Sequence, residues 1–312
     1  MNKIPVLAVV GPTASGKTAL AVSLAEFYGA EVVSADSMQI YRGMDIATAK
    51  PAPEEMRGVR HHLIDFLDPA ESYSAAAFCA DAAKAVEDIV SRGRRVILCG
   101  GTGLYTDSFL SGLRFADEPE NETLRRKLQA RKETEGIEAL YEELRALDPE
   151  TAAAVHINNE KRVLRALELY YATGEKPSAV RARAKAAEAP YRSETVGLFF
   201  EDRALLYDRI DRRVDRMLEA GLVEEARAFY AADSAGTAAQ AIGYKELKPY
   251  LDGALPLETA AENLKRATRR YAKRQLTWFG RNGDIHRIYR DGLSDEDVFE
   301  KARAVIDDTG LF

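Results

Sequence analysis

The N-terminal region contains a candidate phosphate-binding loop between a predicted strand at residues 4–10 and a predicted helix at 18–28. The loop follows the pattern G-x-x-x-x-G-K-[ST] and consists of Gly11, Pro12, Thr13, Ala14, Ser15, Gly16, Lys17 and Thr18. Its glycines allow backbone N–H groups to close around phosphate oxygens, and the helix N-terminus adds positive potential. Lys17 would contact terminal phosphate oxygens, and the Thr18 hydroxyl would bind Mg²⁺. This motif of nucleotide-binding proteins predicts a bound phosphate without identifying which one.

A P-loop protein that hydrolyses ATP also needs a strand that ends in Asp, which holds Mg²⁺ through water. Here the predicted strand at residues 95–99 is followed by Gly100, Gly101 and Thr102. Two glycines and a hydroxyl at the carboxyl end of a strand suit contact with a phosphate or a small ligand. We therefore predict that the loop holds a diphosphate for group transfer.

A carboxylate follows the second predicted strand, at residues 31–35. In a doubly wound sheet, this position places Asp36 in the crevice beside the phosphate loop. A carboxylate there can accept a proton from an amine that acts as a nucleophile. The same residue could instead be a helix N-cap or a water-mediated Mg²⁺ contact. Ser37 and Gln39 add donors and acceptors suited to the edge of a base.

A strongly basic segment lies near the C-terminus, where residues 265–281 contain seven basic residues and no acidic one. The predicted helix at 257–279 carries six of them in two adjoining i,i+4 rows: Lys265, Arg269 and Lys273, and Arg266, Arg270 and Arg274. Most charge runs are solvated helix faces, but two cationic rows without an acidic partner favour contact with a polyanion such as RNA. A second basic cluster, Lys161, Arg162 and Arg165, lies on another predicted helix.

The bulk composition narrows the classes of protein further. The chain has 312 residues, 46% hydrophobic and 30% charged, as in ordinary globular proteins. No apolar run approaches the roughly 18 residues that span a bilayer. The net charge of −6 argues against a general nucleic-acid binder, so the local basic segment matters more. Cys79 and Cys99 favour two buried free thiols in a reducing cytoplasm, and no His/Cys spacing indicates zinc.

Alternating strands and helices predict an α/β fold: a P-loop NTPase-like core with a parallel sheet flanked by helices. The predicted strands are residues 4–10, 31–35, 62–66, 95–99 and 195–200, with an edge strand at 286–289. Long helices are predicted at 74–91, 203–230 and 257–279. The region from 121 to 171 predicts only helices. We therefore expect a core of residues 1–119 and 195–312 and a helical insertion at 120–194.

These motifs resemble the bacterial tRNA dimethylallyltransferases. The resemblance rests on G-P-T-A-S-G-K-T (11–18), S-A-D-S-M-Q-I-Y-R-G-M-D-I-A-T-A-K (34–50) and G-G-T-G-L-Y (100–105). R-V-L-R-A-L-E (162–168), A-I-G-Y-K-E (241–246) and K-R-Q-L-T-W-F (273–279) add to it. These motifs span nearly the whole chain and occur in the same order as in the family.

The resemblance implies transfer of a dimethylallyl group from dimethylallyl diphosphate to N6 of the tRNA adenosine just 3′ of the anticodon, with Mg²⁺. It implies that Asp36 is the general base, that Lys17 and the channel residue Thr102 take part in catalysis, and that the helical insertion contacts the anticodon arm. The expected base-facing residues are Asp36, Ser37, Met38, Gln39 and Thr102. Expected tRNA contacts on the insertion are Arg125, Lys161 (where Gln is usual), Arg162, Val163, Leu164 and Arg165. The basic segment adds Arg269, Arg270, Lys273 and Arg274.

Three other functions remain open from the residues. An adenylate isopentenyltransferase performs the same chemistry on a free nucleotide and needs neither the insertion nor the basic helix. A P-loop small-molecule kinase is disfavoured by the missing Asp after residues 95–99. A non-enzymatic RNA-binding protein would leave Lys17 and Asp36 without a role.

Overall fold

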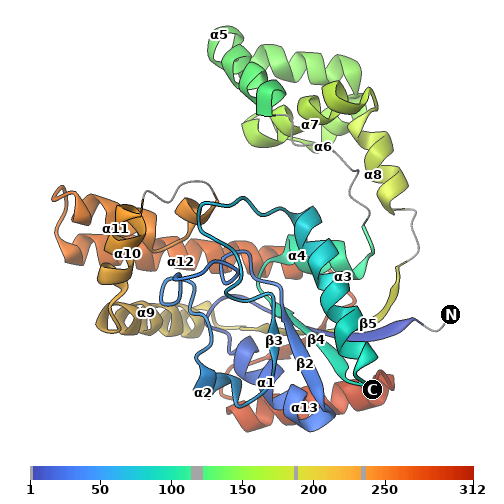
Figure 1. The fold of residues 1–312 in the computed structure, drawn as a ribbon, viewed down its shortest axis with the longest axis vertical. Helices are drawn as coiled ribbons and strands as arrows, with labels where there is room; N and C mark the ends of the chain where they lie inside the picture. Colours follow the sequence, from blue (N-terminus) through green and yellow to red (C-terminus); the bar gives the residue numbers. More distant parts are fainter. Residues whose placement is uncertain (1–2, 114–121, 186–188, 233–236) are drawn as a thin grey trace. The chain divides into compact units, whose positions relative to one another are not determined.

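A six-stranded sheet forms the centre of the larger unit of the chain (Figure 1). The structure, a computed structural model, describes residues 3–113, 122–185, 189–232 and 237–312. The strands are β1 (Ile4–Val10), β2 (Ala30–Ser34), β3 (His61–His62), β4 (Arg95–Gly100), β5 (Tyr191–Phe199) and β6 (His286–Tyr289). Their order is β3-β2-β4-β1-β5-β6, and every pair is parallel. The predicted α/β class with a parallel sheet is confirmed.

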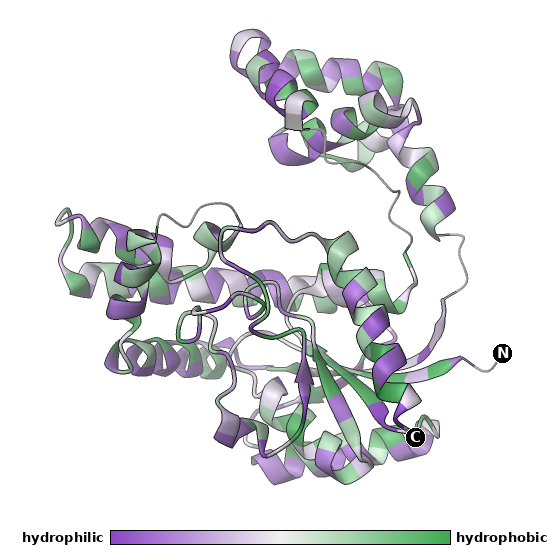
Figure 2. Ribbon diagram, in the orientation of Figure 1, coloured by the Kyte–Doolittle hydropathy of each residue, from purple (hydrophilic) through white to green (hydrophobic). Residues whose placement is uncertain are grey.

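Helices cover both faces of this sheet, because alternate strand residues point to opposite sides. Leu7 and Val9 of β1 pack in one core with helices α1 and α13, whereas Val6 and Ala8 pack in another with α3. The central strands are largely coloured as hydrophobic in Figure 2. The helices of this unit are α1 (Lys17–Tyr28), α2 (Pro53–Met56), α3 (Ala75–Ser91), α4 (Gly103–Leu110), α9 (Arg203–Glu219), α10 (Leu222–Ala231), α11 (Tyr244–Leu251), α12 (Leu257–Phe279) and α13 (Asp295–Thr309), with a 3₁₀ turn η1 (Ala238–Gln240).

Three predicted elements differ from the structure. The strand predicted at 62–66 ends at His62, because Leu63 and Asp65 have φ angles of 59° and 58° that extended backbone does not permit. The helix predicted at 203–230 is two helices, since Gly221, with φ 100°, turns the chain between α9 and α10. The strand predicted from 195 begins at Tyr191, four residues earlier.

The second unit comprises residues Ser111–Ala189, and the first comprises Met1–Leu110 and Pro190–Phe312. The helices of the second unit are α5 (Glu122–Leu147), α6 (Pro149–Ala154), α7 (Glu160–Thr173) and α8 (Pro177–Lys185). Leu140 and Leu144 are fully buried in a small core with Val163 and Leu167, which confirms that this region is helical with its own core. The expected lower boundary, at residues 119–120, lies outside the described residues.

His61 and His62 form β3, the edge strand that pairs with β2. His62 Nε2 lies 2.7 Å from Glu31 Oε2, and the Arg92 guanidinium also pairs with this buried carboxylate. The hydrogen bonds from Arg92 and then His62 lower the pKa of Glu31 to about 2, although burial opposes them. His62 therefore has a structural role as a partner of Glu31.

Both cysteines are free thiols. Cys99 is buried and Cys79 only half-buried, which corrects the expectation that both are buried. Burial raises the pKa of Cys79 to about 11 and that of Cys99 to about 12, so neither is an activated nucleophile. Among the described residues, no helix is long and apolar enough to span a membrane.

Candidate phosphate and nucleic-acid site

Three loops meet at the carboxyl edge of the sheet, because β2, β4 and β1 are neighbours. After β2, the Ala35 N–H donates to the Cys99 carbonyl at 2.8 Å, and after β4 the Thr102 N–H donates to the Ala35 carbonyl at 3.2 Å. The Ser37 N–H donates to Thr102 Oγ1 at 3.1 Å. The structure therefore brings Asp36, Ser37 and Thr102 together, beside the phosphate loop that follows β1.

The phosphate loop is held from two sides. The Thr13 N–H donates to Gln275 Oε1 of α12 at 2.8 Å. From α9, Arg209 Nε donates to the Ala14 carbonyl at 2.9 Å. Ala14 has a positive φ of 63°, which a non-glycine residue adopts only when its surroundings enforce it. Contacts from α9 and α12 therefore shape a loop that local sequence alone would leave strained.

Lys17, at the start of α1, is the positively charged residue of the phosphate loop. Burial lowers its pKa, and the positive charge of Arg213 acts in the same direction. The negative charges of Cys99, when ionised, and Asp36 oppose this shift. A partly desolvated ammonium group next to another cation is in a favourable place to receive an anion.

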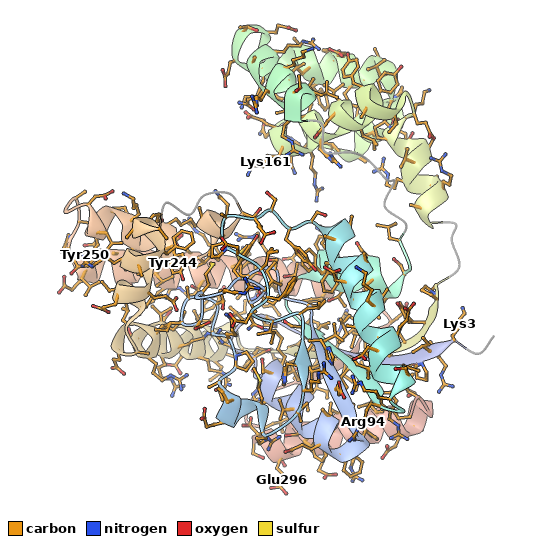
Figure 3. All side chains as sticks on the ribbon, in the orientation of Figure 1. Lys3, Arg94, Lys161, Tyr244, Tyr250 and Glu296 are labelled. Atoms are coloured by element: carbon orange, nitrogen blue, oxygen red, sulfur yellow. The ribbon has the colours of Figure 1, made fainter. Side chains whose placement is uncertain are left out.

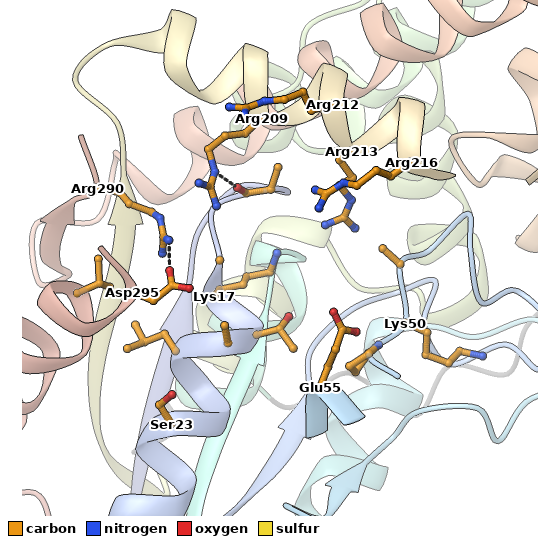
Figure 4. A pocket seen from close by; sticks show the side chains of 18 of the residues that line it. Lys17, Ser23, Lys50, Glu55, Arg209, Arg212, Arg213, Arg216, Arg290 and Asp295 are labelled. Atoms are coloured by element: carbon orange, nitrogen blue, oxygen red, sulfur yellow. Dashed lines mark hydrogen bonds and ion pairs between the residues drawn. The ribbon is translucent and has the colours of Figure 1, made fainter. Parts of the chain in front are cut away.

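A cavity of about 1020 Å³ opens above the loop and α1 (Figure 4). Its cationic lining residues are Lys17, Lys50, Arg57, Arg209, Arg212, Arg213, Arg216 and Arg290. Its acidic lining residues are Glu55, Asp215, Glu219 and Asp295. The cations outnumber the acids, so the cavity suits a multiply charged anion such as a diphosphate.

Four of these cations, Arg209, Arg212, Arg213 and Arg216, lie on α9, and sequence reasoning missed them. They lie at i, i+3, i+4 and i+7, which places them on one helical face. This periodicity is the sequence signal that could have identified them. Arg213 is half-buried, and burial lowers its pKa while the charge of Asp36 opposes the shift. Figure 4 shows Arg213 and Arg216 reaching from α9 toward the side of the cavity that holds Lys17.

Asp36 is half-buried, and one of its oxygens is already occupied. Its Oδ1 accepts the N–H groups of Met38 at 2.9 Å and Gln39 at 3.3 Å. The capping geometry considered from the sequence is therefore present, although no helix begins there. These two bonds orient the carboxyl group and leave Oδ2 as the oxygen available to a substrate.

The side chains of Gln39 and Met38, close to Asp36, make contacts within the protein. The Gln39 amide donates to the carbonyls of Thr48 at 3.4 Å and Ala49 at 3.2 Å, and its oxygen accepts from Ser34 Oγ. Met38 packs against a hydrophobic core. These contacts hold the loop in the free protein, and contact of Met38 and Gln39 with the target base stays a prediction.

The basic helix α12 is only partly available to a polyanion. Lys265 pairs with Asp215 at 2.7 Å and with Glu262, and Arg269 pairs with Asp211 at 2.5 Å. The premise that both cationic rows lack acidic partners is therefore wrong, because α9 supplies carboxylates from far away in the sequence. The cations that stay exposed on α12 are Arg266, Arg270, Lys273 and Arg274.

The predicted RNA contacts of the second unit, at Arg125 on α5 and at residues 161–165 on α7, differ in exposure and in ion pairing. Lys161, labelled in Figure 3, and Arg162 are exposed. Arg125 and Arg165 both pair with the buried Glu168, at 3.2 Å and 3.1 Å. The other two expected contacts are Val163 and Leu164. The Val163 side chain is fully buried in the small core and Leu164 is half-buried against it, so Val163 supports the helix and cannot present its side chain to RNA.

The donor set near the loop fits Mg²⁺ bound mainly through a ligand. Among the described residues, no group of three or more His, Cys, Asp or Glu side chains could hold a metal ion. Mg²⁺ usually takes one or two protein oxygens and completes its shell with phosphate oxygens and water. The half-exposed Thr18 beside the loop can supply such an oxygen.

The fold and the site define an α/β protein with a P-loop NTPase-like core, in which a cationic cavity lies beside the loop that follows β1. The family model described as IPP transferase matches residues 39–282. The chain is 49% identical to the tRNA dimethylallyltransferase of Geobacillus thermodenitrificans over 275 residues, covering 88% of this chain and 87% of that one. It is 47% identical to the enzyme of the same name from Geobacter metallireducens, covering 91% and 92%.

Solved structures agree. The crystal structure of the tRNA isopentenylpyrophosphate transferase from Bacillus halodurans aligns with a TM-score of 0.73 at 44% identity, covering 98% of this chain and 96% of that one. A eukaryotic dimethylallyltransferase, described as acting on tRNA, aligns with a TM-score of 0.82 at 31% identity, covering 98% and 79%. The chain belongs to the IPP transferase family, and the resemblance seen in its motifs is confirmed.

Arg213→Gln is expected to weaken binding of inorganic diphosphate by about tenfold to a hundredfold, the worth of one hydrogen bond to a charged group. Isothermal titration calorimetry of the purified protein measures this affinity. Arg227→Gln removes the same charge from an exposed position on α10 and serves as the control. Equal affinities for the two variants would remove Arg213 from the diphosphate site.

Proposed function

We propose that this chain transfers a dimethylallyl group from dimethylallyl diphosphate to N6 of the adenosine just 3′ of the anticodon in tRNA, releasing diphosphate. The observation that carries the proposal is the meeting of a cationic phosphate loop with Asp36 and Thr102 at one edge of the sheet. The relatives named as tRNA dimethylallyltransferases over most of the chain support it. The tRNA would be met in the cytoplasm, where both free thiols stay reduced.

In this reaction, N6 attacks the allylic carbon as the carbon–oxygen bond to the diphosphate breaks. The bonding electron pair leaves with the diphosphate, and N6 passes a proton to Asp36. Lys17, Arg213 and the N–H groups of the loop stabilise the charge that grows on the leaving group. Mg²⁺ held by Thr18 would neutralise part of the same charge. The adenine must leave its stack to reach a site inside the protein.

The test is transfer of labelled dimethylallyl diphosphate to unmodified tRNA or to AMP, in buffer free of ATP. We expect label in tRNA alone, and Lys17→Ala should reduce transfer more than tRNA affinity, because Lys17 meets charge that develops in the transition state. Label in AMP would instead indicate an adenylate isopentenyltransferase. Transfer that requires ATP would contradict the assignment of the loop to diphosphate.

Asp36→Asn is expected to keep tRNA binding and to lose roughly 10²–10⁴-fold in turnover, the usual contribution of a positioned base. The amide keeps an oxygen for the Met38 and Gln39 N–H groups, so the loop conformation is preserved. Single-turnover transfer and filter binding separate the two effects. Turnover within a few-fold of the wild type would exclude Asp36 as the base.

Replacing Arg270, Lys273 and Arg274 together by Gln should weaken tRNA binding and flatten its salt dependence, by about one slope unit for each phosphate that is no longer neutralised. The matched control changes three exposed cations elsewhere in the same unit: Arg227, Lys245 and Lys301. Fluorescence anisotropy with labelled tRNA at several salt concentrations measures the slope. If both triple variants give the wild-type slope, the exposed row on α12 is only a solvated face.

A further inference from the structure

The inner face of α12 contacts the turn that follows β4, residue by residue. Tyr271, Gln275 and Trp278 lie at i, i+4 and i+7 on this helix, so their side chains share one face. The Tyr271 hydroxyl lies within hydrogen-bonding reach of Thr102, and the Gln275 amide donates to the Gly101 carbonyl at 2.9 Å. The Trp278 ring covers Gly103, where a Cβ would lie 2.2 Å from Trp278 Cδ1.

Gln275 also contacts the phosphate loop. Its Oε1 accepts the Thr13 N–H at 2.8 Å while its Nε2 donates to Gly101, and the side chain is only 5% exposed. One buried amide therefore joins two loops that leave different strands. Gly101 makes this possible, since a Cβ there would lie 2.2 Å from Gln275 Nε2.

The orientation of this amide is fixed by its partners. The Thr13 N–H can only donate and the Gly101 carbonyl can only accept, so the Gln275 oxygen must face Thr13 and its nitrogen must face Gly101. Both ends are satisfied in a buried place, where an unpaired polar group is costly. A side chain that lacks the acceptor or the donor would leave one of the two loops without its partner.

We propose that Gln275 is a positioning residue for the transfer step. It sets the separation between the phosphate loop, which receives the diphosphate, and the turn that carries Thr102 beside Asp36. The proposal rests on the proposed function, since it takes the loop as the diphosphate site. Gln275 itself touches neither substrate, because its polar ends bind the backbone of Thr13 and Gly101 and its amide also lies within hydrogen-bonding reach of the Tyr271 hydroxyl.

The pH dependence of two variants tests this role. Gln275→Met removes both hydrogen bonds and should lower kcat/KM for dimethylallyl diphosphate by about tenfold or more at every pH, with KM for tRNA unchanged. Gln275→Glu keeps the acceptor, and its carboxyl donates to the Gly101 carbonyl only when protonated. Burial raises the pKa of such a carboxyl. The ratio of Gln275→Glu to wild-type activity should therefore rise as the pH falls from about 8.5 to 5.5, while the Gln275→Met ratio stays flat.

The control variant is Thr277→Val, because Thr277 is exposed and its hydroxyl donates to the Lys273 carbonyl of the same helix. Wild-type kcat/KM in Gln275→Met, or a flat ratio for Gln275→Glu, would overturn the proposal. A wild type that transfers no label would instead contradict the proposed function. The two failures are therefore distinguishable.

A double-mutant cycle tests the same contact from the other side, and also covers the case in which Gln275→Met does not fold. Gly101→Ala should reduce kcat/KM strongly in the wild type, because the new Cβ displaces the Gln275 amide. In a Gln275→Ala background, the same change should cost several-fold less, since the amide is gone. Equal losses in both backgrounds would contradict the proposal.

Discussion

The site depends on two backbone hydrogen bonds between chain segments that leave neighbouring parallel strands. The bonds from Ala35 to Cys99 and from Thr102 to Ala35 extend the pairing of β2 and β4 beyond the sheet. Through the backbone alone, they bring together the two segments that carry Asp36 and Thr102. Because β1 pairs with β4 on the other side, the phosphate loop must lie at the same edge. The strand order therefore puts Asp36 and the phosphate loop side by side.

The clustered positive charges of the cavity are the second constraint, because their mutual repulsion destabilises the free protein. Burial lowers the pKa of Lys17, Arg209 and Arg213, and a neighbouring arginine adds to the shift at each of them. Such repulsion costs stability when no anion is present. A bound diphosphate would remove that cost, so binding should stabilise the folded state more as the ligand concentration rises. The arginines of α9 would thus lower the stability of the free protein and raise its affinity for the proposed diphosphate.

The sequence predicted what is encoded locally. The P-loop motif, the strands around it and Asp36 at the end of β2 all follow from patterns within a few residues. The rest depends on contacts between distant residues. Glu225 accepts the N–H groups of residues 45–47 at 2.7–2.9 Å, and thereby fixes the loop after Asp36. Asp211 neutralises Arg269 in the same way. No local pattern identifies partners about 60 to 180 residues apart.

Asp36 lies close enough to two cations of the cavity to interact with their charges. In the free protein, the charge of Asp36 interacts with both Lys17 and Arg213. The proposed diphosphate competes for the same two cations and carries more charge. Its arrival would draw them toward the loop and leave Asp36 Oδ2 to the amine, while Met38 and Gln39 keep Oδ1 in place. In the proposed reaction, the diphosphate and the amine would thus use different groups of one site: the cations for the diphosphate and Asp36 for N6.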